Sequence, residues 1–196
     1  MKTFWPLTLF LGFATLLLVF FCLAAFRNPG YVKWDGVIDF QELLDKCNPL
    51  DMCPECKIIR TPRSWHCNIC NLCVERFDHH CPYINNCVGY NNHSYFLLFI
   101  FFIVVNLLYN AFLTIWGIVW YINHSKEQLY TKRWLEMWGM NDTIYNILYF
   151  SGVSINLAIA FFFAIPTILL FYVHIINYCK NMTTNEWYSK TNQNQK

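Results

Sequence analysis

Seven of the ten cysteines lie in one polar stretch of the chain, and three histidines lie among them. These residues are Cys53, Cys56, Cys67, Cys70, Cys73, Cys81 and Cys87, with His66, His79 and His80. Histidines interleaved with cysteines at two-residue spacings are typical of zinc ligands, whereas a disulfide framework needs no histidines. The stretch therefore predicts a metal-binding module whose thiols stay reduced.

A tetrahedral zinc site takes four protein ligands, so eight of these residues can close two sites. Neighbours in the chain such as His66 and Cys67 point in different directions, which favours ligands that alternate between two ions. One consistent assignment gives Cys53, Cys56, His66 and Cys73 to the first ion and Cys67, Cys70, His80 and Cys87 to the second. Cys81 and His79 are then left over, and this surplus is the most informative feature of the sequence.

Spacing alone leaves this assignment open. Exchanging His79 for His80, or Cys81 for Cys87, would also complete a site. A RING-type ubiquitin ligase is a competing interpretation of such a cluster. Its histidine normally lies inside a Cys-x-His-x2-Cys step, whereas here a histidine directly precedes a cysteine, so the fit is poor.

The elements around the module are those of a membrane protein. The chain of 196 residues is 56% hydrophobic and 19% aromatic, against about 45–50% apolar residues in soluble domains. A net charge of +2 without a long basic run does not favour a nucleic-acid partner.

Three uncharged apolar segments, residues 4–26, 95–122 and 144–178, are long enough to cross a bilayer. The first exceeds the apolar core of a signal peptide, which is about 7–15 residues. The third is longer than a bilayer requires, so it must tilt, kink near Pro166 or continue as a helix. The fold class expected is an all-α membrane protein of three helices, with the loop-rich double-zinc module between the first and second.

Basic residues predict the orientation of these helices. The side with the module holds Arg27, Lys33, Lys46, Lys57, Arg60, Arg63, Arg76, Lys180, Lys190 and Lys196, and the other side holds Lys2, Lys126, Lys132 and Arg133. Cytoplasmic loops are the richer in lysine and arginine. We therefore expect the module and the tail in the cytosol, and the N-terminus and residues 123–143 on the lumenal or extracellular side.

Polar residues inside the apolar segments are costly to expose to lipid and should face other helices. This expectation covers Asn106, Asn110, Asn146 and Asn156. His93 and His174 are expected to be packing residues rather than metal ligands.

Several motifs resemble the DHHC palmitoyltransferase family. The matching residues are Asp78-His79-His80-Cys81-Pro82, Asn86-Cys87-Val88-Gly89, Asn92, Phe96, Thr61 to Cys67, Thr183-Thr184-Asn185-Glu186, and Asn28-Pro29-Gly30 in place of the usual Asp-Pro-Gly. The resemblance implies the zinc assignment given above, with two structural Zn²⁺ ions that have no open coordination position. It also implies that Cys81 is the nucleophile, activated by His79, with Asp78 orienting the imidazole.

The activity implied is protein S-acylation in two half-reactions. Cys81 takes a palmitoyl or similar acyl group from acyl-CoA, and a cysteine of a membrane-associated protein then takes it from Cys81. Thr183, Thr184 and Glu186 are expected to brace the active-site loop. Lys57, Arg60 and Arg63 are candidates for the CoA phosphates, with a solvated basic face as the alternative.

The family generally has four membrane spans, and this sequence matches from the second onwards. We expect a first helix upstream or an accessory subunit that closes the acyl cavity. Residues 27–94 are expected to form the cytosolic zinc domain and residues 179–196 the cytosolic tail. The location expected is the Golgi, the endoplasmic reticulum or the plasma membrane. A catalytically inactive zinc-containing membrane adaptor is the alternative function.

Overall fold

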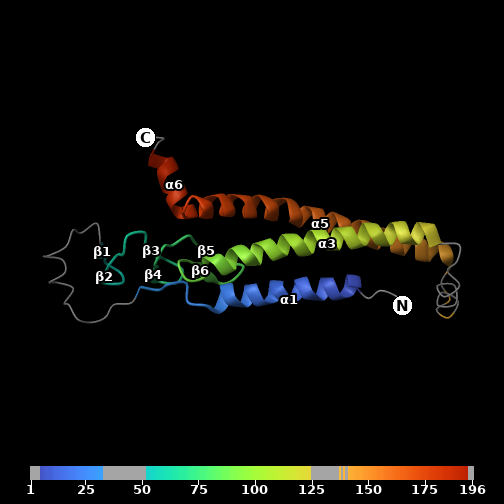
Figure 1. The fold of residues 1–196 in the computed structure, drawn as a ribbon, viewed down its shortest axis with the longest axis horizontal. Coiled ribbons are helices and arrows are strands. Elements are labelled where there is room, and N and C mark those ends of the chain that lie inside the picture. Colours follow the sequence, from blue (N-terminus) through green and yellow to red (C-terminus); the bar gives the residue numbers. More distant parts are fainter. Residues whose placement is uncertain (1–4, 33–51, 125–136, 138, 140, 194–196) are drawn as a thin grey trace. The chain divides into compact units, whose positions relative to one another are not determined.

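The computed structural model describes residues 5–32, 52–124, 137, 139 and 141–193 (Figure 1). Its helices are α1 (Trp5–Phe26), α3 (His93–His124), α5 (Asp142–Cys179) and α6 (Thr184–Gln193). Its strands are β1 (Met52–Cys53), β2 (Ile58–Ile59), β3 (Trp65–Cys67), β4 (Leu72–Val74), β5 (His79–Cys81) and β6 (Asn86–Val88). Lys33, Lys46 and most of the 123–143 loop lie outside the described residues.

The helices α1, α3 and α5 are long and apolar enough to cross a membrane, at 22, 32 and 38 residues. The cysteine-rich strands lie between α1 and α3 in the chain. This confirms the predicted fold class. The third segment is one helix through Pro166 that ends at Cys179, so it continues beyond the length that a bilayer needs.

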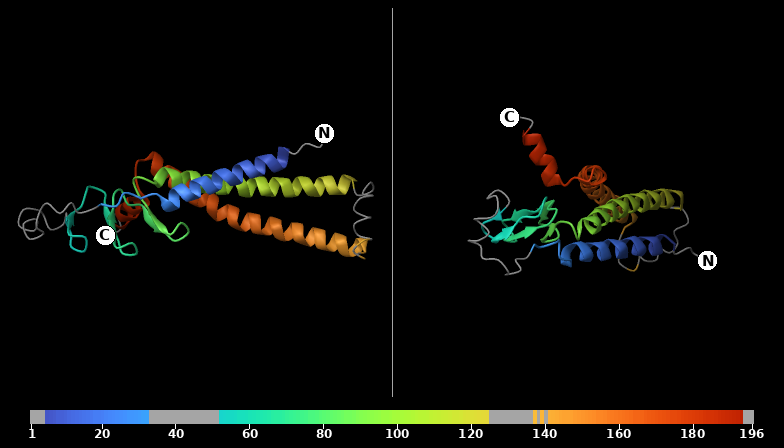
Figure 2. Two further views of the ribbon diagram at one scale, coloured as in Figure 1. Left: turned by 90° about the horizontal axis from the view of Figure 1, so that it is seen from below. Right: turned by 60° about the vertical axis from the view of Figure 1, so that its left-hand side comes forward.

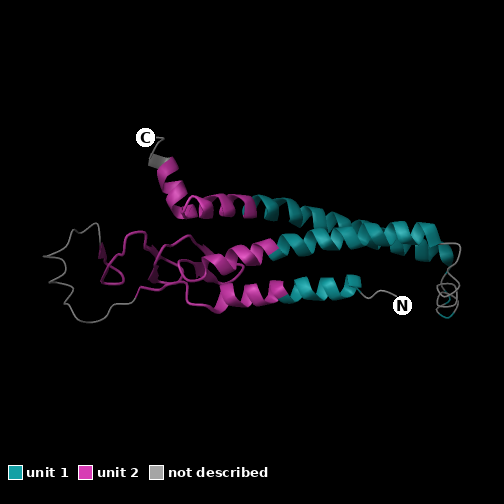
Figure 3. Cartoon of the chain, in the orientation of Figure 1, with its two compact units in different colours: residues 1–15, 102–170 teal, residues 16–101, 171–196 magenta. Residues whose placement is uncertain are grey.

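The chain divides into two compact units, drawn in two colours in Figure 3. The first contains residues 1–15 and 102–170. Within it, Asn106 donates to the Phe13 carbonyl at 3.2 Å and Asn110 donates to Asn156 at 3.1 Å. Asn146 accepts a hydrogen bond from Tyr121. Each of the four asparagines therefore meets another segment of its unit, as expected from the cost of exposing an amide to lipid.

The second unit contains residues 16–101 and 171–196 and holds the whole cysteine module. Three antiparallel hairpins follow one another in it: β1 with β2, β3 with β4, and β5 with β6 (Figure 2). Each turn has one residue at positive φ, namely Lys57, Asn71 or Asn85. Asparagine tolerates this left-handed conformation better than most residues, so two of the three tight turns have a suitable residue at that position.

Gly89 allows the backbone to approach the second hairpin closely. A Cβ atom at this position would lie 2.5 Å from Val74 Cγ1 and 2.6 Å from the Pro29 carbonyl oxygen. Any larger residue would push β6 away from Val74, which is fully buried. The glycine of the Asn-Cys-Val-Gly motif is therefore a packing requirement of the module.

The end of α1 is held by two asparagines of the module. Asn92 is fully buried, and its amide donates to the Ala24 carbonyl at 3.0 Å and to the Cys87 carbonyl at 2.8 Å. Asn86 donates to the Ala25 and Arg27 carbonyls at 3.0 and 2.9 Å. The last carbonyls of a helix have no partner inside the helix, so these amides join α1 to the strand that carries Cys87.

We predict that Asn92→Ala destabilises the module by about 2–4 kcal/mol, because it removes three buried hydrogen bonds, to the Ala24 and Cys87 carbonyls and from the Gly89 amide. Thermal unfolding of detergent-solubilised protein would show a lowered midpoint. Asn91→Ala is the matched control, since Asn91 is exposed, and it should leave the midpoint unchanged. Equal midpoints for the two variants would show that Asn92 does not anchor α1.

Candidate active site and metal centres

The first Cys/His cluster combines the first two hairpins. Cys53, Cys56, His66 and Cys73 each offer one ligand atom, and these four atoms lie within 4.8 Å of one another. His66 Nδ1 is 3.5 Å from Cys53 Sγ, 3.2 Å from Cys56 Sγ and 3.9 Å from Cys73 Sγ. The other ring nitrogen, Nε2, contacts the Glu55 carboxylate.

The second cluster combines the second and third hairpins. Its ligand atoms come from Cys67, Cys70, His80 and Cys87 and also lie within 4.8 Å of one another. His80 Nδ1 is 3.8, 3.4 and 3.6 Å from the sulfurs of Cys67, Cys70 and Cys87. Both clusters thus have three sulfurs facing one imidazole nitrogen, a donor set and spacing that fit structural zinc.

Cys81 lies outside both clusters although it is in the same module. It is only 4% exposed and belongs to an apolar cluster with Ala24, Ile84, Val88, Phe96 and Ile100. This cluster brings together the end of α1, the third hairpin and the start of α3. A thiol here is bordered by apolar side chains rather than by metal-ligating atoms.

A chain of polar contacts leads from Cys81 to a buried carboxylate. His79 lies two residues before Cys81, on the same face of β5, and its Nδ1 donates to Asp78 Oδ2 at 2.6 Å. Asp78 is 2% exposed. This order of thiol, imidazole and carboxylate is the arrangement that activates a cysteine nucleophile.

The electrostatics of these three groups favour a charged pair. Burial opposes ionisation of each group, but mutual hydrogen bonds outweigh it. The pKa of Asp78 is lowered to about 2 by His79 and the Thr184 amide, and the pKa of His79 is raised to about 9 by Asp78 and Cys81. The pKa of the Cys81 thiol is lowered by His79 and by the backbone amides of Ile84 and Tyr83. Cys81 is therefore disposed to be a thiolate beside an imidazolium.

The chain repeats at a 14-residue interval, and this repeat accounts for the free thiol. Cys53, Cys67 and Cys81 occupy the same position in the three hairpins. The residue three places later is Cys56, then Cys70, but Ile84 in the third hairpin. Cys70 N donates to Cys67 Sγ at 3.4 Å, and the Ile84 amide, at the corresponding position, lowers the pKa of the Cys81 thiol. The third hairpin keeps a turn that stabilises a thiolate but lacks the partner ligands.

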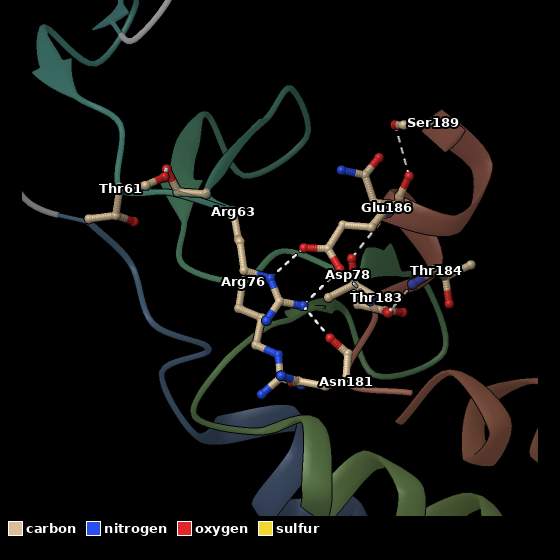
Figure 4. Close-up of polar contacts among 11 residues, drawn as sticks. Thr61, Arg63, Arg76, Asp78, Asn181, Thr183, Thr184, Glu186 and Ser189 are labelled. Carbon is tan, nitrogen blue, oxygen red and sulfur yellow. Dashed lines mark hydrogen bonds and ion pairs between the residues drawn. The ribbon is translucent and has the colours of Figure 1, made fainter. Parts of the chain in front are cut away.

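The carboxylate of Asp78 also lies at the start of α6 (Figure 4). The Thr184 amide donates to Asp78 Oδ1 at 2.6 Å. Thr183 Oγ1 accepts from the Glu186 amide at 3.2 Å, and Glu186 Oε2 accepts from the Thr183 amide at 2.8 Å. This reciprocal pair is a capping box, which fixes the first turn of a helix. The positive end of α6 thereby faces the buried carboxylate.

Two arginines connect the second hairpin to the turn before α6. Arg63 forms a two-pronged ion pair with Glu186, with Nη2 2.7 Å from Oε2, and Nη2 also donates to the Asn181 carbonyl at 2.9 Å (Figure 4). Arg76 donates to Asn181 Oδ1 at 2.6 Å. Asn181 has a φ of 53°, a conformation common just after a helix end. These contacts hold α6 on Asp78.

The three cations considered for CoA phosphates are placed differently. The guanidinium of Arg63 is engaged by Glu186 and Asn181. Arg60 lies over the Trp65 ring at 5.7 Å. Lys57 is at the tip of the first turn. A phosphate-binding role for them stays a prediction.

We predict that Glu186→Gln slows the acyl transfer that the sequence resemblance leads us to expect about three- to tenfold, because it removes the charge that holds Arg63 and weakens the anchor of α6. Initial rates of autoacylation would measure this. Lys190→Gln changes a charge on the exposed part of the same helix and should have no effect. Equal rates for the Glu186 and Lys190 variants would show that the anchor of α6 does not affect the reaction.

Three residues near the site were not predicted to be functional. The sequence gives no prediction for Asn181, and it predicts His93 and His174 to be packing residues. In the structure, Asn181 accepts hydrogen bonds from both Arg63 and Arg76. His174 lies with Asp78 and His79 in a third group of potential metal-ligating side chains. The Thr-x-x-Glu spacing was a visible signal for the capping box, but the long-range contacts of Asn181 and His174 had no local signal.

Comparison with known proteins agrees with this site. The family model described as DHHC palmitoyltransferase matches residues 46–191. Palmitoyltransferase akr1 of Schizosaccharomyces pombe is 46% identical over 84 residues, covering 39% of this chain and 13% of that protein. Palmitoyltransferase ZDHHC4 of Mus musculus is 32% identical over 184 residues, covering 87% and 52%. Palmitoyltransferase ZDHHC5-B of Danio rerio is 32% identical over 180 residues, covering 85% and 24%.

The chain thus spans about half or less of the length of these curated relatives. The family match nevertheless covers the zinc-type clusters, the Asp-His-His-Cys strand and the capping box of α6. It extends over more than half of the sequence. The chain belongs to the DHHC palmitoyltransferase family.

Proposed function

We propose that this protein is a protein S-acyltransferase that moves a palmitoyl or similar acyl group from acyl-CoA to cysteine thiols of membrane-associated proteins. One observation carries the proposal. Cys81 lies outside both Cys/His clusters, is buried among apolar side chains and shares a face of β5 with His79, which is held by Asp78.

The reaction proposed has two steps. The Cys81 thiolate attacks the thioester carbonyl carbon of acyl-CoA, and the carbon–sulfur bond to CoA breaks as the new thioester forms. The CoA thiolate leaves with the proton from His79. In the second step, a substrate thiol gives its proton to His79 and attacks the acyl group, which returns Cys81 to the thiolate.

The apolar cluster around Cys81 suits this chemistry. It includes Ala24 and Phe96, with Phe21, Phe99 and Phe171 packed against it. Burying an acyl chain gains about 0.8 kcal/mol for each CH₂ group. A long acyl chain would therefore enter the membrane side of this cluster and leave its thioester at Cys81.

The metal clusters would hold two Zn²⁺ ions as structural centres, each closed by four protein ligands. Bound zinc supplies rigidity to a module of three short hairpins, which has little core of its own. Residues 27–94 would form this cytosolic domain and residues 179–196 the tail that braces Asp78. Lys57, Arg60 and Arg63 are proposed to meet CoA phosphates.

The purified chain in detergent micelles, given labelled palmitoyl-CoA, should acquire a label that hydroxylamine removes. After the remaining palmitoyl-CoA is removed, a chase with a cysteine peptide should move that label from the protein to the peptide. The inactive adaptor predicts folded protein with two zinc ions and no label. That outcome would overturn the proposal.

A further inference from the structure

His174 is a buried histidine that the reaction described above does not use. It lies on α5 and is 4% exposed. Its Nδ1 atom has no hydrogen-bond partner among the described residues and lies 3.8 Å from Asp78 Oδ2. That oxygen is the one that accepts the hydrogen bond from His79.

The surroundings of His174 orient its ring towards the reacting groups. Its ring centroid is 5.5 Å from that of His79 and 5.4 Å from that of Phe96. Phe171 and Tyr178 lie on the same face of α5. Phe171 packs on the apolar cluster that contains Cys81, and the Tyr178 ring is 5.5 Å from that of His93. This face of α5 therefore runs along the catalytic groups.

A buried nitrogen without a partner is unfavourable, and its persistence calls for a reason. Hydrogen bonds of catalytic groups are often long before substrate binds and shorten in the complex. Asp78 already accepts at one oxygen from Thr184 and at the other from His79. The second oxygen has a free lone pair on the side of His174 for one more donor.

We propose that His174 is a positioning residue of the acyl-transfer site, whose Nδ1–H donates to Asp78 when acyl-CoA is bound. This rests on the proposed acyltransferase function. The added donor fixes the Asp78 carboxylate and, through it, the ring of His79 against Cys81. His174 thus connects the membrane helix α5 to the nucleophile without touching the reacting atoms.

The test compares His174→Phe with His174→Asn. Phenylalanine keeps the ring but removes the donor, and the asparagine amide nitrogen can occupy roughly the place of Nδ1. His174→Phe should lower the kcat of autoacylation about tenfold with KM for palmitoyl-CoA nearly unchanged. His174→Asn should recover most of the rate. Alkylation of Cys81 by iodoacetamide should slow in the same order.

Tyr178→Phe is the control, because it removes a polar group from the same helix face at a residue that contacts His93 and Ser94. It should match the wild type. His174→Phe at the wild-type rate would overturn the proposal, as would His174→Asn no faster than His174→Phe with zinc content and thermal midpoint intact. Wild-type protein that fails to label at all would instead refute the acyltransferase function.

Asp78, His79 and His174 together could also ligate a metal ion, since their ligand atoms lie within 4.8 Å of one another. Elemental analysis distinguishes this case. Two zinc ions per wild-type chain support the positioning role. Three ions per chain, reduced to two in His174→Phe, would overturn it.

Discussion

Replacing Cys81 with serine is expected to reduce acyl transfer to background, a loss of about three orders of magnitude or more. The serine hydroxyl cannot ionise near neutral pH, so the interactions that lower the pKa of the Cys81 thiol would have no thiolate to stabilise. The hydroxylamine-sensitive label from palmitoyl-CoA measures this loss. Because Cys81 ligates neither cluster in the structure, the variant should still hold two zinc ions.

Cys179→Ser is the matched control for this prediction. Cys179 is an exposed free cysteine at the end of α5, and its loss should leave transfer to Cys81 intact. If the label persists in Cys81→Ser and disappears in Cys179→Ser, then Cys179 carries the acyl group and Cys81 is not the nucleophile. Loss of zinc from Cys81→Ser would also contradict the proposal, because it would show that Cys81 is a zinc ligand.

The second large effect is expected from removing a zinc ligand. Cys73 is fully buried in the first cluster and Cys87 in the second. Structural zinc contributes roughly 10–16 kcal/mol to the folding of small metal domains, more than short two- and three-residue strands can replace. Cys73→Ala or Cys87→Ala should therefore lower zinc content to about one ion per chain or less and unfold the module.

Elemental analysis, thermal unfolding and autoacylation should change together in these variants. Both should lose activity although neither residue contacts the acyl group in the proposed reaction. Cys22→Ala serves as the control, since Cys22 lies in α1 outside both clusters, and this variant should retain two ions. A Cys73 variant that keeps two zinc ions and full activity would remove Cys73 from the ligand set.

Much of the fold follows from local properties of the sequence. Length and apolarity were sufficient to predict the three long helices, because a bilayer imposes a minimum span on any crossing helix. The residues at which the helices begin and end were harder to predict. The third helix begins at Asp142, where Asn141 Oδ1 accepts a hydrogen bond from the Thr143 amide at 3.0 Å, and ends at Cys179, just before the turn at Asn181. These limits depend on such local contacts rather than on apolarity.

The two ligand groups were also visible in the spacing, but spacing left Cys81 and Cys87 interchangeable. In the structure, the two cysteines occupy different positions in the repeated hairpin. Cys87 corresponds to Cys73 in the preceding hairpin, whereas Cys81 corresponds to Cys53 and Cys67 and has Ile84 where they have a second cysteine. A search for the 14-residue interval would have shown this difference from the sequence.

The contacts across long sequence separations could not be predicted in this way. His174 and Asp78 meet because α5 ends beside the third hairpin, and the two residues are far apart in the chain. Arg63 was predicted to meet phosphates from its charge alone. Its engagement by Glu186 depends on where α6 begins, which no pattern around Arg63 reveals.

The most direct test of the central claim is a map of thiol reactivity in zinc-loaded protein. Brief treatment with a small alkylating reagent, followed by peptide mass spectrometry, reports each cysteine separately. We expect rapid modification of Cys81, suppressed by prior incubation with palmitoyl-CoA, and protection of the six ligand cysteines until a chelator removes the metal. Protection of Cys81 together with the ligands, and its release only by the chelator, would contradict the account.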